Sequence, residues 1–156
     1  MDTKILLENG TNELEVLEFI LDGYAYGINV AKVKEIAPYQ ETVPVPHANT
    51  CIEGIFMPRD KLITAIDLRS CLGRGPSKPG GLYIITNFNK LDIAFHVDGV
   101  RRIHRVSWEA IIKPGAELFN EEESITTGIV KLEGRLVIIL DFEKIYPDAT
   151  VIKLEQ

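Results

Sequence analysis

The chain contains two copies of one sequence pattern, and this internal duplication limits its fold more than any other feature. The first copy reads, in order, Gly54-Ile55, Lys61-Leu62-Ile63 and Ile66-Asp67-Leu68. The second copy reads Gly128-Ile129, Arg135-Leu136-Val137 and Leu140-Asp141-Phe142. The glycine and the aspartate are thirteen residues apart in both copies, and every apolar position between them is in register.

A second pair of segments extends the duplication toward the N-terminus. Gly27-Ile28-Asn29-Val30 continues to Val33-Lys34-Glu35-Ile36, and its counterpart Ala94-Phe95-His96-Val97 continues at the same spacing to Val100-Arg101-Arg102-Ile103. The chain therefore divides into unit one, about residues 17–73, and unit two, about residues 82–146. The segment 74–81 contains two prolines and three glycines, a composition typical of a linker.

Strand signals dominate both units. Short runs rich in β-branched and aromatic residues alternate with turn residues, and the clearest runs are Glu18–Leu21, Leu62–Ile66, Leu82–Thr86, Asp92–Val97 and Leu136–Leu140. Short helical pieces are predicted at Ala31–Ile36, Ser107–Ile112 and Phe142–Ile145. A unit of about 60 residues buries too little surface to be stable alone. We therefore predict a mostly β chain whose two units pack against each other and can exchange a strand.

Composition excludes several classes of protein. The net charge of −6 argues against nucleic-acid binding, which depends on Lys and Arg side chains that neutralise phosphates. No apolar run approaches the roughly 20 residues of a membrane-spanning helix, and the start of the chain has no signal-peptide pattern. Cys51 and Cys71 each lie in an apolar pattern and are predicted to be reduced, although they could be neighbours in space. These features predict a cytoplasmic protein without direct membrane insertion.

We find no arrangement of residues that predicts catalysis, a metal or a cofactor. The three histidines lack metal-ligand spacing, and no nucleophile elbow or phosphate-binding loop is present. His96 is predicted to face solvent, on a strand that turns its apolar side inward. Asp67 and Asp141 each follow an apolar strand and are predicted to cap the next short helix. The basic run 101–105 is predicted to be a solvated strand edge, which leaves an apolar groove or rim as the expected binding surface.

The motifs of the two units resemble the CheW-like coupling domain of bacterial chemotaxis. The resemblance covers roughly residues 14–147 and rests on four motifs in order, which are residues 19–36, Gly54–Leu72, residues 95–100 and Gly128–Ile145. It implies a fold of two intertwined five-stranded SH3-like β-barrels with short helices. It also implies a non-catalytic adaptor that links chemoreceptor cytoplasmic tips to the histidine kinase CheA, in the cytoplasm and next to membrane receptor arrays.

Within the family, the chain is most similar to the N-terminal domain of CheV-type proteins. Residues 6–15, the segment Phe88-Asn89-Lys90 and residues 102–109 carry this similarity. It divides the chain into an N-terminal leader at 1–13, the CheW-like domain at 14–147 and a C-terminal tail or linker at 148–156. CheV proteins carry a C-terminal receiver domain, and this chain stops before one could begin. We therefore expect either an excised coupling domain or a naturally short form.

The resemblance also implies two sets of contact residues. A receptor helical hairpin in a groove between the barrels would contact Val30, Val33, Glu35, Ile36, Arg59, Val100 and Ile103. The kinase would contact Gly54, Phe56, Met57 and Arg59 at the end of a barrel. The family usually has Arg-Gly at the turn where this chain has Arg59-Asp60, and an aspartate at positive φ would strain that turn mildly.

Two other functions remain open at this stage. One is a small metal-dependent hydrolase that uses Asp67, Asp98 and His96. The other is the CheW-like regulatory domain of a kinase, cut from a longer chain; the methionine start and the CheV-like leader count against it.

Overall fold

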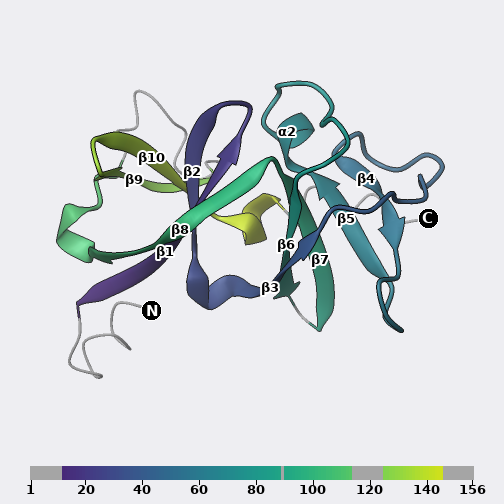
Figure 1. Cartoon of the computed structure of the whole chain (residues 1–156), viewed down its shortest axis with the longest axis horizontal. Coiled ribbons are helices and arrows are strands. Elements are labelled where there is room, and N and C mark those ends of the chain that lie inside the picture. The colour runs from purple at the N-terminus through teal and green to yellow at the C-terminus, as the bar shows by residue number, and fades with distance from the viewer. Residues whose placement is uncertain (1–11, 89, 114–124, 146–156) are drawn as a thin grey trace.

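The computed structural model describes residues 12–88, 90–113 and 125–145, and these residues form two five-stranded β-sheets (Figure 1). The strands in chain order are β1 Glu13–Leu21, β2 Tyr24–Asn29, β3 Val33–Pro38, β4 Ile52–Phe56, β5 Ile63–Asp67, β6 Leu82–Phe88, β7 Leu91–Val97, β8 Gly99–Ser107, β9 Thr126–Leu132 and β10 Arg135–Leu140. Short helical turns occur at η1 Val30–Lys32, α2 Leu68–Cys71, η2 Trp108–Ala110 and residues 142–145. Most of the predicted leader and all of the predicted tail lie outside the described residues.

Each sheet combines strands from both sequence units. Barrel A has the strand order β8-β1-β2-β10-β9, and barrel B has the order β3-β6-β7-β5-β4. The first two strands of each unit thus join the last three strands of the other unit, and the two barrels lie side by side (Figure 1). The exchange predicted from the marginal size of each unit is confirmed, and it involves more than one strand.

The two barrels repeat the same pairing at the same positions. Strand β10 runs parallel to β2 with Ile139 opposite Gly27, and β5 runs parallel to β7 with Ala65 opposite Ala94. Gly27 and Ala94 occupy the same place in the duplicated pattern, as do Ala65 and Ile139. The sequence repeat is therefore a repeat of strand register, and we call such positions repeat-equivalent.

A backbone bridge joins the two edges of each sheet and closes it into a barrel. Val43, which follows edge strand β3, pairs with Ile55 on edge strand β4, and Ile112, which follows β8, pairs with Ile129 on β9. The preceding glycines make this crossing possible. A Cβ atom at Gly54 would lie 2.6 Å from the carbonyl oxygen of Val43, and one at Gly128 would collide with Ile111. The paired glycines of the repeat therefore mark the closure point of each barrel.

Among the described residues, three apolar clusters form the core, and the largest lies between the barrels. Barrel A encloses one cluster that includes Val16 and Val137, and barrel B encloses another that includes Tyr83 and Ala94. The shared cluster takes side chains from both sheets and from the turn after β10. In this cluster, the ring centroid of Phe142 lies 4.1 Å from the ring centroid of Phe95 in barrel B. It lies 5.9 Å from the ring centroid of Phe19 in barrel A. The barrels therefore share a core.

The predicted helix caps agree with the structure, whereas one predicted helix does not. Asp67 caps α2 by accepting a hydrogen bond from the Ser70 amide, and Ser107 caps η2, both as expected. The helix predicted at Ala31–Ile36 is wrong, because only η1 is helical and the rest forms β3. The segment is a strand because β6 supplies a pairing partner along it, a long-range contact that overrides local propensity.

We predict that Gly27→Ala destabilises the fold by about 1–3 kcal/mol, the range for overpacking a well-filled site. The new Cβ atom would lie 2.6 Å from Cγ1 of Val16 inside barrel A. Gly99→Ala is the control, because no atom lies within 4 Å of a Cβ added there. Urea unfolding of both variants measures the difference, and equal stability would contradict the close approach of β2 to its neighbours.

Candidate functional site

The predicted receptor contacts lie mainly on two repeat-equivalent edge strands, β3 in barrel B and β8 in barrel A. Ile36 on β3 is 42% exposed and its equivalent Ile103 on β8 is 50% exposed, so both present apolar surface. Val30, Val33 and Val100 are half-buried and pack against the shared core. The structure therefore separates the predicted set into two exposed isoleucines and three supporting valines.

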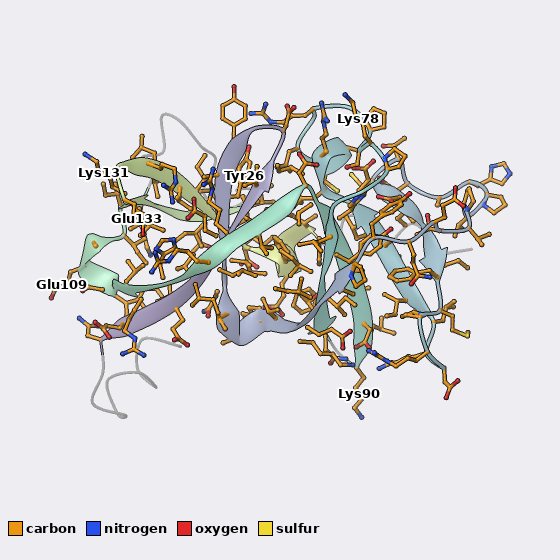
Figure 2. The ribbon with its side chains drawn as sticks, in the orientation of Figure 1. Tyr26, Lys78, Lys90, Glu109, Lys131 and Glu133 are labelled. Atoms are coloured by element: carbon orange, nitrogen blue, oxygen red, sulfur yellow. The ribbon has the colours of Figure 1, made fainter. Side chains whose placement is uncertain are left out.

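The remaining two predicted receptor contacts form an ion pair. Arg59, in the turn after β4, donates to both carboxylate oxygens of Glu35 on β3 at 2.9 Å. Barrel A has an ion pair at the repeat-equivalent positions with the charges reversed, because Arg102 on β8 donates to Glu133 in the β9–β10 turn at 2.9 Å (Figure 2 labels Glu133). Each ion pair connects one edge strand of a sheet to the hairpin turn at the opposite edge of the same sheet.

A second pair of ionic clusters lies beside these ion pairs, and each contains a buried carboxylate. In barrel B, Asp92 on β7 accepts from Lys34 at 2.7 Å and lies 3.3 Å from the Lys61 amine. In barrel A, Glu18 on β1 lies 2.8 Å from Arg135 and 3.5 Å from Arg101. Lys34 and Arg101 are repeat-equivalent, and so are Lys61 and Arg135. The same cation positions thus meet a buried carboxylate in both barrels, although it comes from different strands.

Both buried carboxylates remain ionised, because hydrogen bonds from their partners lower the pKa by more than burial raises it. Burial alone would raise the pKa of Asp92, but hydrogen bonds from Lys34, Asn87 and Lys61 bring that pKa below its ordinary value. The pKa of Glu18 is lowered in the same way, against burial, by hydrogen bonds from Arg135 and His104. The cations around each carboxylate are therefore held at fixed positions by a full negative charge.

The predicted kinase contacts differ in accessibility. Phe56 is 5% exposed and its ring stacks on Tyr83 with centroids 4.8 Å apart, and Gly54 is buried beneath the Val43 bridge. Met57 is exposed, as is Leu62 on the other side of the same turn. The sequence interpretation missed Leu62 because it placed this residue within a strand. Leu62 is repeat-equivalent to Leu136, which is also exposed.

The turn at Arg59-Asp60 carries no backbone strain. In the described part of the chain, the non-glycine residues at positive φ are Asp22, His47, Lys90 and Glu133, and Asp60 is not one of them. The turn therefore does not need the left-handed backbone freedom of a glycine at this position, and Arg59 reaches Glu35 without a special backbone conformation at its neighbour.

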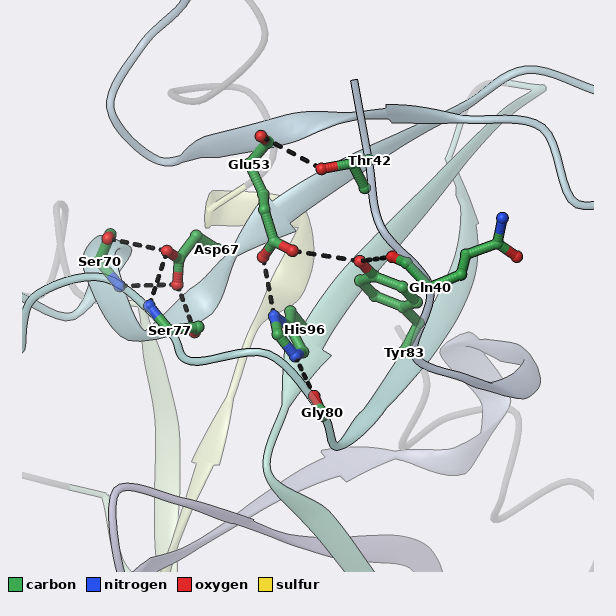
Figure 3. A network of polar contacts seen from close by, with 9 residues as sticks. All are labelled: Gln40, Thr42, Glu53, Asp67, Ser70, Ser77, Gly80, Tyr83 and His96. Carbon is green, nitrogen blue, oxygen red and sulfur yellow. Dashed lines mark hydrogen bonds and ion pairs between the residues drawn. The ribbon is translucent and has the colours of Figure 1, made fainter. Parts of the chain in front are cut away.

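The prediction for His96 is wrong, because this side chain is only 2% exposed. Strand β7 lies between β6 and β5, with the shared core on one face and the interior of barrel B on the other. His96 points into that interior, where Nδ1 lies 2.8 Å from the Glu53 carboxylate and Nε2 lies 2.6 Å from the Gly80 carbonyl oxygen (Figure 3). An alternating pattern predicts one solvent-exposed strand face only when no other part of the protein covers that face. Both faces of β7 are covered here.

The partners of His96 require both ring nitrogens to be donors. A carboxylate and a backbone carbonyl can only accept hydrogen bonds, so the arrangement fits the imidazolium form. Burial by itself lowers the pKa of His96. The hydrogen bonds to Glu53 and Gly80 raise this pKa by more than burial lowers it, so the net shift is upward. This network fastens the linker that precedes β6 to the interior of barrel B.

The residues proposed for a hydrolytic metal site have other roles. Both carboxylate oxygens of Asp67 accept hydrogen bonds from Ser70 and Ser77, and Asp98 accepts one from the Asp22 amide (Figure 3 shows Asp67). Within the described ranges, no three His, Cys, Asp or Glu side chains are grouped as metal ligands would be. In the same part of the chain, no helix has the length and apolar character needed to cross a membrane.

We predict that the stabilising effect of His96 is lost as the pH rises. Because its folded-state pKa is raised, the contribution is complete below the unfolded value of about 6.5 and disappears above the folded-state pKa. At about pH 6, His96→Gln should lower the free energy of unfolding by about 1–3 kcal/mol, and the difference should shrink by about pH 9. Urea titrations across this range measure it, and Glu53→Gln should move the transition to lower pH. A difference independent of pH would contradict an imidazolium at this position.

Comparison with known proteins places this geometry in one family. Residues 15–150 match the CheW-like domain family. Chemotaxis protein CheV3 of Helicobacter pylori is 35% identical over 153 residues, which cover 88% of this chain and 48% of CheV3. Chemotaxis protein CheW of Thermotoga maritima is 28% identical over 149 residues, which cover 93% of this chain and 95% of that protein. The chain thus spans about half the length of CheV3 and nearly all of this CheW.

A solved structure has the same fold. The crystal structure of the scaffolding protein TtCheW from Thermoanaerobacter tengcongensis matches with a TM-score of 0.72 and 24% identity, over 81% of this chain and 83% of that one. This match confirms the predicted mostly β architecture of two five-stranded barrels. With a family match over nearly all described residues and relatives of both CheV and CheW type, the chain belongs to the CheW-like family.

Proposed function

We propose that this chain is a non-catalytic chemotaxis adaptor that couples chemoreceptor cytoplasmic tips to the histidine kinase CheA. One observation supports this proposal most strongly: each barrel presents an exposed isoleucine, Ile36 or Ile103, on a repeat-equivalent edge strand. Exposed apolar side chains bordered by charged groups are typical of surfaces that bind other proteins. Membership in the CheW-like family supports the choice of partners.

In this proposal, the receptor tip contacts Val30, Val33, Glu35, Ile36, Arg59, Val100 and Ile103. A helix that binds in a groove needs an apolar floor and polar edges that set its position. The three valines are half-buried and suit the floor, whereas Ile36 and Ile103 are exposed and suit apolar contacts beside it. The Glu35–Arg59 ion pair suits the polar edge, since Arg59 is largely exposed and retains free donor groups for a partner.

The proposed kinase contact is the end of barrel B around Met57 and Arg59. Gly54 and Phe56 belong to it as supports, because Phe56 packs beneath the turn and Gly54 allows the Val43 bridge. Met57 and Leu62 supply the exposed apolar surface. A flexible Met side chain adapts its shape to an apolar partner surface.

The proposed location follows from these partners. An adaptor that joins receptor tips to a kinase works in the cytoplasm, beside the membrane that holds the receptors. It needs no nucleic acid, no cofactor and no segment inserted in the bilayer.

We predict that Ile36→Glu and Met57→Glu separate the two binding activities. Ile36→Glu should weaken binding to a receptor signalling-tip fragment by about tenfold or more, because a carboxylate would replace exposed apolar contact area. Met57→Glu should weaken binding to CheA by a similar factor and leave receptor binding unchanged. Calorimetric titration with each partner measures both affinities.

Both substitutions replace exposed side chains, so circular dichroism should show an unchanged fold. Each variant is the control for the other. Failure of the unmodified protein to bind either partner in co-sedimentation would refute the proposed function. A loss of both activities in both variants would refute only the assignment of two separate surfaces.

A further inference from the structure

At the end of barrel B, the carboxylates of two ionic contacts are less exposed to solvent than the cations that contact them. The Asp92 side chain is 4% exposed, while the Lys34 and Lys61 side chains that contact it are 44% and 55% exposed. In the neighbouring pair, Glu35 is likewise less exposed than Arg59. We call these five residues the barrel B cluster: Lys34, Glu35, Arg59, Lys61 and Asp92. The three cations of the cluster are more exposed than its two carboxylates, and the exposed Asp60 lies between Arg59 and Lys61 in the same turn.

The cluster has more positive than negative charge. Three cations face two carboxylates, so one positive charge has no counterpart within the cluster. The excess is concentrated at Asp92, because the amines of Lys34 and Lys61 both approach the same oxygen atom, Oδ2. Two ammonium groups this close repel each other, and an additional anion in front of them would lower the energy of the pair.

We propose that the barrel B cluster binds a carboxylate of the receptor tip, and that Asp92 is the residue that positions the two lysines for it. This inference rests on the proposed adaptor function and specifies the chemistry of the partner. The partner segment would be an acidic amphipathic helix, whose carboxylate approaches Lys34 and Lys61 while its apolar face covers the exposed Ile36.

The sequence positions of the cations fit such a helix. Lys34 precedes the exposed Ile36 by two residues on β3, so both side chains lie on the more exposed face of that strand. The surface at β3 therefore places a cation beside an exposed apolar side chain. This combination provides apolar contact area together with an electrostatic preference for an acidic partner.

Asp92 reduces the cost of binding by ordering the lysines in advance. A free lysine loses much rotamer freedom when a partner immobilises it. Here the hydrogen bond from Lys34 and the contact of Lys61 hold both amines at the protein surface before a partner arrives. Asn87 completes the arrangement by donating to the other carboxylate oxygen of Asp92 at 2.6 Å. Preorganisation of this kind increases affinity without adding a contact.

The test compares Lys34→Gln/Lys61→Gln with the control Lys131→Gln/Lys144→Gln in binding to a purified receptor signalling-tip fragment. Lys131 lies on β9 in barrel A (Figure 2), and Lys144 lies in the helical turn after β10, so the control removes two positive charges outside the cluster. The cluster variant should bind about tenfold more weakly and the control should match the unmodified protein. Affinity of the unmodified protein should fall between about 0.05 M and about 0.5 M sodium chloride, and the cluster variant should lose most of this salt dependence.

Charge reversal identifies the partner group. Acidic residues of the receptor tip are changed one at a time to lysine, and one change should weaken binding to the unmodified protein. Combination with Lys34→Glu/Lys61→Glu should restore part of that loss. Thermal unfolding of each variant checks that the fold persists, and the salt dependence of the unmodified protein tests the proposal even if a variant fails to fold.

The outcomes distinguish this proposal from the adaptor function. Receptor binding that is insensitive to salt and unchanged in Lys34→Gln/Lys61→Gln would overturn the docking site and leave the adaptor function intact. No receptor binding by the unmodified protein would overturn both. Tighter retention on phosphatidylglycerol vesicles than on the receptor fragment would overturn the assignment of a protein partner.

Discussion

The apolar core between the two barrels is the contact on which the rest of this structure depends. Phe142 illustrates its role, because the ring comes from the turn after β10 and packs against Phe95 of barrel B and Phe19 of barrel A. The strand exchange adds a second dependence, since each sheet is incomplete without strands from the other unit. Neither unit can therefore keep a barrel if the other unfolds. The edge strands β3 and β8 hold their positions because this core supports the half-buried valines beside them.

The duplicated architecture repeats its backbone pairing but not all of its charges. The backbone bridge that closes each barrel and the parallel strand register occur at repeat-equivalent positions. The ion pair between edge strand and hairpin also occurs twice, but Glu35–Arg59 in one barrel corresponds to Arg102–Glu133 in the other. The two barrels therefore present opposite charges at repeat-equivalent positions of otherwise similar surfaces.

The repeat allowed much of this structure to be predicted, and the failures have specific causes. Asp67 caps a helix as expected, because capping depends on residues close in sequence. The strand at β3 was predicted to be helical because its pairing partner β6 lies far along the chain. His96 was assigned to the solvent because the alternating pattern does not reveal that a second layer covers the polar side of β7. Ile36 was predicted as a contact from the family pattern, and Leu62 was missed.

The amino-acid sequence by itself determined the duplication, the strand-rich composition, the capping aspartates and the resemblance to the CheW-like family. These features depend on residue type and spacing within one unit, so they are readable along the chain. Only the tertiary structure decided which strands join which barrel, that His96 is buried between Glu53 and Gly80, and that Lys34 and Lys61 meet at Asp92. Each of these depends on contacts between residues far apart in sequence, and the pairing of distant strands brings them together.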